Sequence, residues 1–309
     1  MVSSGVLSNQ LSLGIMWTLR LKGIFMFEAF NLKFNNEQLG LILTPEVLSK
    51  VPEYKSFLKK GLYSNPESHL EKLREHLIES KDVLDGEKII GDWFPLNHFD
   101  IFLSHSHKDE PLAIIFALIL KMECGLNVFI DSIYWGFADN LLKEIDNKYA
   151  YDNSSQTYSY ETRNKTTSNV YLMLNAALID VIDKSECLIF FNSENSIYQG
   201  GDSSKLYNSE TYSTSPWLMS ELNFSSKARK VYPERISSTS KRIQFNDSLS
   251  KSANNSIEIK YKLPMEHLND LSESKFSEWF NYITDNKLSP HESLDYLYEL
   301  TNLGYQSKD

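Results

Sequence analysis

Cysteine is scarce in this chain of 309 residues, which contains only Cys124 and Cys187. Two cysteines cannot build a disulfide-rich framework or a four-cysteine zinc site. Both lie in apolar stretches, where a cysteine is typically a buried thiol. Because free thiols persist in reducing compartments, we expect two structural cysteines and a cytoplasmic protein.

Glycine and basic residues are also limited. The chain has 12 glycines, and Gly200 and Gly201 stand alone in a polar stretch, so no glycine-rich phosphate loop is expected. Lys and Arg total 31 against 41 Asp and Glu, which gives a net charge of −10. This balance argues against general binding to nucleic acid, which needs a basic surface, but it leaves room for a local site for an anionic nucleotide.

Long hydrophobic runs are absent as well. The longest run, Leu112–Leu120, has nine residues, whereas a membrane span needs roughly 18. Arg20 and Lys22 interrupt the apolar N-terminal segment, and a signal peptide carries its charges before the apolar block rather than inside it. We expect no membrane partner, and we interpret this segment as an element packed on the body or as an upstream extension before a true start at Met26.

The composition that is present is that of a globular protein, with 41% hydrophobic and 23% charged residues. The length is about twice the ~150 residues of a typical domain, so one large or two modest domains are expected. Residues 1–97 carry no motif, and apolar spacing predicts an amphipathic helix over 67–80. We therefore expect a mainly helical N-terminal extension over 1–97.

The pattern changes at Phe99. Phe99–Leu103 is a compact apolar run that predicts a buried strand, and Asn127–Asp131 predicts a second one. Between them, Leu112–Cys124 predicts an apolar helix that starts after Pro111 and stops at Gly125. Strand, helix and strand within about 33 residues form a βαβ unit, which implies a parallel sheet.

The rest of the chain continues this alternation. The expected elements are a loop at 132–137, a helix from Ala138, a helix at Val170–Ser185, a strand at Cys187–Phe191, a helix from Pro216 to Lys230 capped by Ser215, a strand at Ile257–Leu263, and C-terminal helices near 272–283 and 290–302. Polar stretches at 151–169, 194–215 and 232–256 are interpreted as surface insertions. These patterns predict a core domain over 98–265 and a C-terminal helical segment over 266–309.

Polar residues follow the predicted strands at three places. Ser104–Asp109 comes after the first strand and Asp131 ends the second. Trp217 and Glu221, at positions i and i+4, share one face of the helix that follows the third strand. Because ligands of parallel sheets bind at the carboxyl ends of the strands, Glu221 is expected at the rim of that crevice. His105 alternates with His107 within the first loop, but no further ligands are evident, so no metal is expected.

These residues carry a resemblance to a known family. The segment Phe99–Asp109 (FDIFLSHSHKD) resembles the opening strand of TIR (Toll/interleukin-1 receptor homology) domains, and NVFID at 127–131 resembles their second strand. Residues 132–137 then occupy the position of the family's BB loop. The segment WLMSEL at 217–222 resembles the Trp-x-x-x-Glu-Leu helix start. The resemblance covers about 98–265, and the polar insertions depart from compact members.

The resemblance implies an α/β, flavodoxin-like parallel sheet with flanking helices. It also implies an enzyme, an NAD+ glycohydrolase or cyclase that needs no cofactor because NAD+ is its substrate. Glu221 takes the position of the family's catalytic glutamate. The substrate-binding residues expected from the resemblance are Ser104, His105, Ser106, Asp131, Trp135 and Trp217.

Other interpretations stay open for the same residues. Trp217 is also compatible with a core position, Glu221 with a solvated helix face, and Ser104 and Ser106 with helix caps. The alternatives to an enzyme are a non-enzymatic TIR scaffold and a nucleotide-binding α/β domain without TIR ancestry. For the enzyme, the resemblance to prokaryotic antiviral (Thoeris-type) proteins implies homo-oligomers through TIR–TIR contacts and a downstream effector that senses the nucleotide product.

Overall fold

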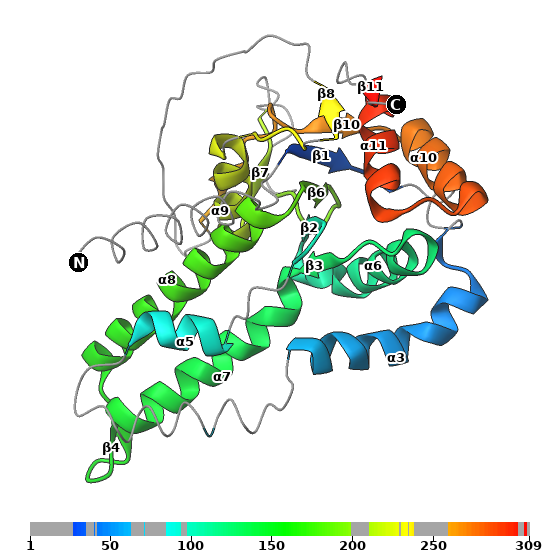
Figure 1. Ribbon diagram of the computed structural model, residues 1–309. Helices are drawn as coiled ribbons and strands as arrows, with labels where there is room; N and C mark the ends of the chain where they lie inside the picture. Colours follow the sequence, from blue (N-terminus) through cyan, green and yellow to red (C-terminus); the bar gives the residue numbers. More distant parts are fainter. Residues whose placement is uncertain are drawn as a thin grey trace, which may run out of the picture.

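The computed structural model describes residues 27–34, 40, 42–62, 71, 85–93, 98–198, 210–228, 230–233, 235–237, 259–301 and 306–307. At its centre lies a five-stranded sheet in which every pairing is parallel (Figure 1). In spatial order the strands are β10 (Asn269–Leu271), β1 (Glu28–Leu32), β6 (Cys187–Phe191), β2 (Ile101–Ser104) and β3 (Val128–Ile130). The predicted α/β class with a parallel sheet flanked by helices is therefore confirmed.

The three strands expected from apolar runs are present as β2, β3 and β6. All of their residues are buried. Strands with helices on both faces have no solvent-facing side chains, and so they consist of continuous apolar runs rather than alternating ones. This is why the sequence reveals these strands most clearly.

Two further strands join the sheet from outside residues 98–265. The order β3-β2-β6 is that of the first three strands of a flavodoxin-like sheet, 2-1-3, and β1 lies in the fourth position between β6 and β10. The segment 1–97, expected to be mainly helical, thus contributes an inner strand. Its sequence, EAFNL, is too short and too mixed to stand out from a helical pattern.

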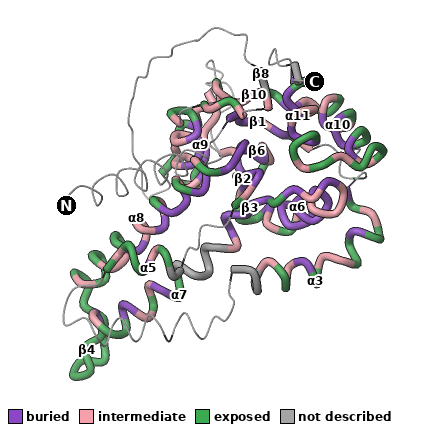
Figure 2. Tube along the Cα trace, viewed as in Figure 1, coloured by how far each residue is buried: buried purple, intermediate pink, exposed green. Residues whose placement is uncertain are grey.

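Two layers of helices cover the sheet (Figures 1 and 2). Ile101 and Leu103 of β2 pack into one core and Phe102 packs into the other, as the alternation of a strand requires. The first layer contains α3 (Pro45–Leu62), α6 (Glu110–Cys124), α10 (Glu273–Asn286) and α11 (Pro290–Leu300). The second contains α5 (Gly86–Trp93), α7 (Asp131–Tyr149), α8 (Tyr160–Lys184) and α9 (Pro216–Lys227).

The apolar helix α6 forms as predicted. A proline lies in its first turn, and Gly125 ends it in the left-handed conformation with φ 74°. The helix is buried on almost every side because β3, α3 and α10 all contact it. Its apolar surface is therefore covered within one chain and needs no second copy of the protein.

The expected loop at 132–137 is wrong, because helix α7 starts directly at Asp131. The expected insertion at 151–169 is also wrong in part. It forms a small hairpin, β4 (Tyr151–Asp152) with β5 (Thr157–Tyr158), and then the first turns of α8. The Ser159 hydroxyl caps α8 by accepting from the Thr162 amide at 3.3 Å. Short polar side chains in a helix look like loop sequence, and the cap is the signal that separates the two.

The elements expected after Ser215 are confirmed in part. Ser215 caps α9 as predicted, but the helix ends at Lys227 rather than Lys230. The two C-terminal helices appear as α10 and α11. In the described part of the predicted strand at 257–263, Tyr261–Lys262 form β9, which pairs with β7 (Tyr212–Ser213). A further pair joins β8 (Ile236–Ser237) to β11 (Gln306–Ser307). Residues 199–209 of one expected insertion and 238–256 of another lie outside the described residues, as do residues 257–258 of the predicted strand and nearly all of the predicted helix at 67–80.

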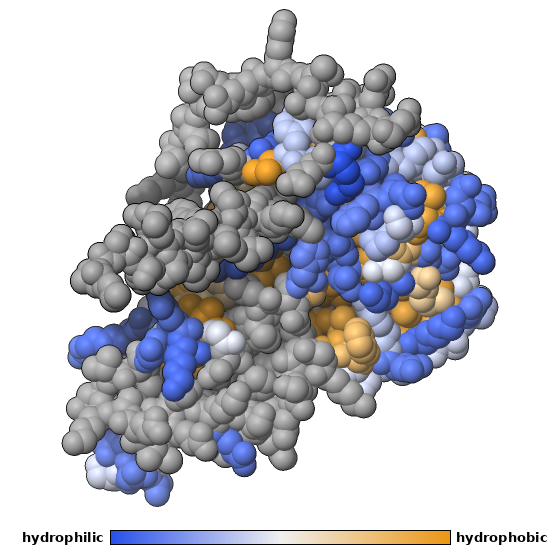
Figure 3. All heavy atoms as spheres, viewed as in Figure 1, coloured by the Kyte–Doolittle hydropathy of each residue, from blue (hydrophilic) through white to orange (hydrophobic). Residues whose placement is uncertain are grey.

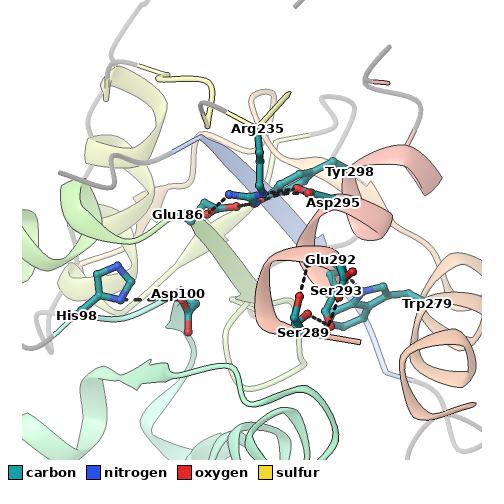
Figure 4. A network of polar contacts seen from close by, with 10 residues as sticks. All are labelled: His98, Asp100, Glu186, Arg235, Trp279, Ser289, Glu292, Ser293, Asp295 and Tyr298. Carbon is teal, nitrogen blue, oxygen red and sulfur yellow. Dashed lines mark hydrogen bonds and ion pairs between the residues drawn. The ribbon is translucent and has the colours of Figure 1, made fainter. Parts of the chain in front are cut away.

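The coloured part of the face in Figure 3 is mostly hydrophilic, with small hydrophobic areas between the polar ones. Within the part of the chain that the structure describes, no helix is both long and apolar enough to cross a membrane. At the amino ends of the strands, Arg235 bonds Glu186 and Asp295, and the Tyr298 hydroxyl donates to Glu186 at 2.9 Å (Figure 4). This network joins the start of β6 to helix α11.

Candidate functional site

Residues from distant parts of the chain meet at the carboxyl ends of the strands. Ser104 is the last residue of β2, Asp131 follows β3, and Glu221 lies in the second turn of α9. The Ser104 hydroxyl donates to Glu221 Oε2 at 2.6 Å, across 117 residues of sequence. Ser104 is 0% and Glu221 2% exposed, so the structure brings the predicted residues together but buries Glu221 instead of leaving it at a rim.

Glu221 and Asp131 form a pair of buried carboxyl groups. Burial raises the pKa of Glu221 well above its usual range, and the negative charge of Asp131 and a hydrogen bond between the two carboxyls raise it further. The hydroxyl of Ser104 acts in the opposite direction, because its hydrogen bond favours the ionised form. A hydrogen bond between two carboxyls requires a proton, which the pair shares, and the raised pKa of Glu221 favours the protonated form of its carboxyl.

His105 holds the other side of Asp131. Its Nδ1 lies 2.9 Å from Asp131 Oδ1 and 3.0 Å from the Leu103 carbonyl oxygen, and its Nε2 lies 3.0 Å from the Ser132 hydroxyl. Burial opposes the charged form of this ring. The charge and hydrogen bond of Asp131, the Leu103 carbonyl and the charge of Asp109 outweigh that effect and raise the pKa of His105.

Ser132, His105 and Asp131 are thus in the contact order of a serine-hydrolase relay. His105 Nδ1 lies within hydrogen-bond distance of the Leu103 carbonyl oxygen and of Asp131 and so carries a proton, which is compatible with such a relay and with a structural role alike. The raised pKa of His105, however, favours the imidazolium form, which cannot accept a proton from a serine. The imidazole therefore suits the anchoring of Asp131 better than it suits a general base.

A second polar group extends the site toward β6. Asp109 Oδ1 accepts from the Asn195 amide at 2.7 Å, and Asp109 Oδ2 accepts from the Ser193 hydroxyl. Ser193 and Asn195 follow β6, and Asp109 follows β2. The chain reverses its direction of travel across the sheet between these two strands, and such a switch point is where parallel sheets bind ligands.

The other predicted residues are Ser106, Trp217 and Trp135. Ser106 is half-buried, and its side chain does not cap the short helix at His107–Asp109. Trp217 is partly buried, and its ring centroid lies 5.7 Å from that of Tyr171 on α8. The side chain of Trp135 lies outside the described residues, and its backbone belongs to α7 rather than to a loop.

Sequence reasoning did not single out Ser132, Ser193 or Asn195. Each follows a strand directly or within a few residues, and that position is the signal that could have found them. His105, expected in a substrate loop, is buried with 2% exposure, whereas its neighbour His107 is exposed. The two rings therefore have different environments.

These residues define a class of protein, an α/β protein with a parallel sheet and a buried carboxyl pair at the carboxyl ends of its strands. In comparisons with known proteins, no family model, no curated protein and no solved structure matches the chain.

Proposed function

We propose that this protein is a TIR-like NAD+ glycohydrolase or cyclase that cleaves the bond between nicotinamide and ribose. One observation carries the proposal. Ser104, Asp131 and Glu221, which belong to the three motifs that resemble TIR domains, meet within hydrogen-bond contact at the carboxyl end of the sheet. Chance matches to three separate motifs would not be expected to converge on one point.

The reaction needs few groups from the protein. As the bond between ribose C1′ and the pyridinium nitrogen breaks, its electron pair goes to nitrogen and nicotinamide leaves as a neutral molecule. The ribose is left with oxocarbenium character and positive charge, which a nearby carboxylate stabilises. Water then adds to C1′ and loses a proton, giving ADP-ribose, while attack by another nucleophile within the substrate gives a cyclic product. Glu221 is the carboxylate proposed for this role.

The protonation of Glu221 matters for this role because only the ionised form offsets the charge of the transition state. The raised pKa of Glu221 favours the protonated form of its carboxyl up to a higher pH than is usual for glutamate. The pyridinium ring of NAD+ brings a positive charge, and a positive charge near a carboxyl favours its ionised form. We therefore expect cleavage to increase as pH rises through the pKa of Glu221.

Incubation of the purified protein with NAD+ and mass spectrometry of the products tests the proposal. We expect nicotinamide together with linear, cyclic or conjugated ADP-ribose. Glu221→Gln keeps the size of the side chain and should abolish the release of nicotinamide, whereas Glu299→Gln, on the exposed surface of α11, should leave it unchanged. Normal turnover by Glu221→Gln would eliminate Glu221 as the catalytic carboxylate.

The burial of Glu221 favours a second candidate, a non-enzymatic TIR scaffold that acts through assembly. At 2% exposure and with Ser104 and Asp131 as partners, the carboxyl is compatible with a purely structural role. A scaffold would release no nicotinamide at any protein concentration. For the enzyme, activity that depends on self-association, a role in antiviral defence and a downstream effector for the product remain proposals.

A further inference from the structure

We propose that Asp131, anchored by His105, is a positioning residue that keeps a proton on Glu221 until a cationic group of the substrate displaces it. The inference deepens the proposed function by adding a control on the same site. It starts from three contacts in series. His105 Nδ1 lies 2.9 Å from Asp131 Oδ1, the carboxyl of Asp131 interacts with that of Glu221, and Ser104 donates to Glu221 Oε2 at 2.6 Å.

The groups around Glu221 and Asp131 have opposite effects on the ionisation of Glu221. From the start of α7, Asp131 disfavours the ionised form of Glu221, and from the end of β2, Ser104 favours it. From the segment after β2, His105 faces Asp131, and Asp109 adds its negative charge near His105. Between α9 and α8, the Ser220 hydroxyl donates to the side-chain oxygen of Asn175 at 2.6 Å, and both groups are neutral.

The anchoring by His105 explains why the proton stays on Glu221. Because the imidazole of His105 lies against Asp131, we infer that the single proton of the pair resides on Glu221. Two carboxyls in contact cannot both ionise without an additional positive charge. The pyridinium group of an oxidised nicotinamide nucleotide would supply that charge, and the proton would then leave to bulk water. Asp131 thus acts through Glu221 and need not touch the reacting atoms.

Titration of the carboxyl carbon of Glu221 tests the inference directly. The protein is labelled with ¹³C in its glutamate side chains, and Glu221→Gln identifies the resonance by its loss. In the unmodified protein the resonance should titrate above the usual glutamate range. Asp131→Asn should move the midpoint to lower pH, and Ser104→Ala, the matched control at Glu221 Oε2, should move it to higher pH. A purely structural role would not produce opposite shifts.

The same variants are assayed for NAD+ cleavage across pH. The limb on which activity rises with pH should move to lower pH in Asp131→Asn and to higher pH in Ser104→Ala. If neither the unmodified protein nor any variant cleaves NAD+ while the titration shifts as expected, the proposed function fails. The inference that Asp131 keeps a proton on Glu221 would still hold. A Glu221 midpoint in the usual range, or one that Asp131→Asn leaves in place, would overturn the inference. Even if Asp131→Asn does not fold, titration of the unmodified protein shows whether the Glu221 midpoint lies above the usual range.

Discussion

The two ends of the same parallel sheet hold buried acidic side chains in different ways. At the amino ends, Glu186 bonds Arg235, and Glu28 accepts from Lys230 at 2.8 Å. At the carboxyl ends, the partners described for Glu221 are a hydroxyl and another carboxyl. The first arrangement offsets each of these negative charges with a positive one. In the second, His105 lies against Asp131, but Glu221 has another acid beside it.

Under the proposed function, the difference separates structural acids from a functional one. Arg235 joins Glu186 at the start of β6 to Asp295 of α11, and so the ion pairs connect the sheet to a C-terminal helix (Figure 4). A carboxyl beside another carboxyl makes no comparable contribution to folding, because ionisation of both is unfavourable. Proteins keep such groups mainly where the chemistry of a site needs them.

The largest expected effect is the loss of activity in Glu221→Gln. The amide still accepts from Ser104 and can donate to Asp131, so folding is preserved while the charge is lost. NAD+ cleavage should fall 10²–10³-fold, on the order of 3–4 kcal/mol of transition-state stabilisation. At neutral pH the free energy of unfolding, measured with denaturant, should be unchanged or higher than in the unmodified protein. A clear loss of stability there would place Glu221 among the structural acids.

Arg235→Gln should instead lower the stability of the protein and leave its activity nearly unchanged. Removing the cation leaves Glu186 and Asp295 without their ion pairs, which should lower the free energy of unfolding by about 3 kcal/mol. This is the lower end of the range for buried pairs, because 27% of the side-chain surface of Arg235 is exposed. Cleavage of NAD+ at a temperature where the variant is folded should remain near normal. A large loss of activity in folded protein would mean that the two ends of the sheet are coupled.

The two ends should also differ in the sign of their pH dependence. His267 donates to or accepts from the Ser225 hydroxyl at 2.7 Å, and burial together with the charge of Lys230 lowers its pKa to about 4. Because its usual pKa is 6.5, the unfolded chain binds more protons between these values, and stability should fall as pH drops from 6.5 to 4. For Glu221, with its raised pKa, stability should instead fall as pH rises above 4.5. Denaturant unfolding across pH measures this effect. His267→Gln should reduce the free energy of unfolding that is lost at acid pH by up to roughly 3 kcal/mol. If the variant loses as much stability at acid pH as the unmodified protein, His267 is not the source of the loss.

Trp217→Ala should lower the stability of the fold only modestly. The ring is partly buried against Tyr171, so the cost should be below the about 3–5 kcal/mol of a fully buried tryptophan. If the ring also positions the substrate, the KM for NAD+ should rise more than kcat falls. Tyr171→Phe, which keeps the neighbouring ring, serves as the matched control. A loss of stability in the full core range would assign Trp217 to the core.

The sequence predicted the elements that are strongly apolar or clearly capped. Strands β2, β3 and β6 are buried on both faces, and α6 has its proline and glycine at the two ends. It did not predict that α7 begins at Asp131, because aromatic residues and a glycine after a strand are typical of loops. It also did not predict strand β1, whose pairing with β6 joins residues about 160 positions apart.

The candidate site was also predicted only in part, because local patterns identify single residues but not their partners in space. The motifs identified Glu221, Ser104 and Asp131 as separate candidates, and the carboxyl-end rule placed them at one edge of the sheet. His105 was expected to contact substrate, yet it is buried and faces Asp131. Hydrogen-bond partners across more than 100 residues depend on how helices and strands pack, which no local pattern contains.

By itself, the sequence determined which segments are apolar enough to form the inner strands and which residue types stand at their ends. These properties are local, because burial selects apolar side chains and turns select particular backbone conformations. Only the tertiary structure decided that β1 and β10 extend the sheet, that α3 and α10 cover α6, and that Asp131 lies against Glu221. The physical reason is that the charge state of a buried carboxyl depends on its neighbours in space and on the exclusion of water, and both arise when the layers pack.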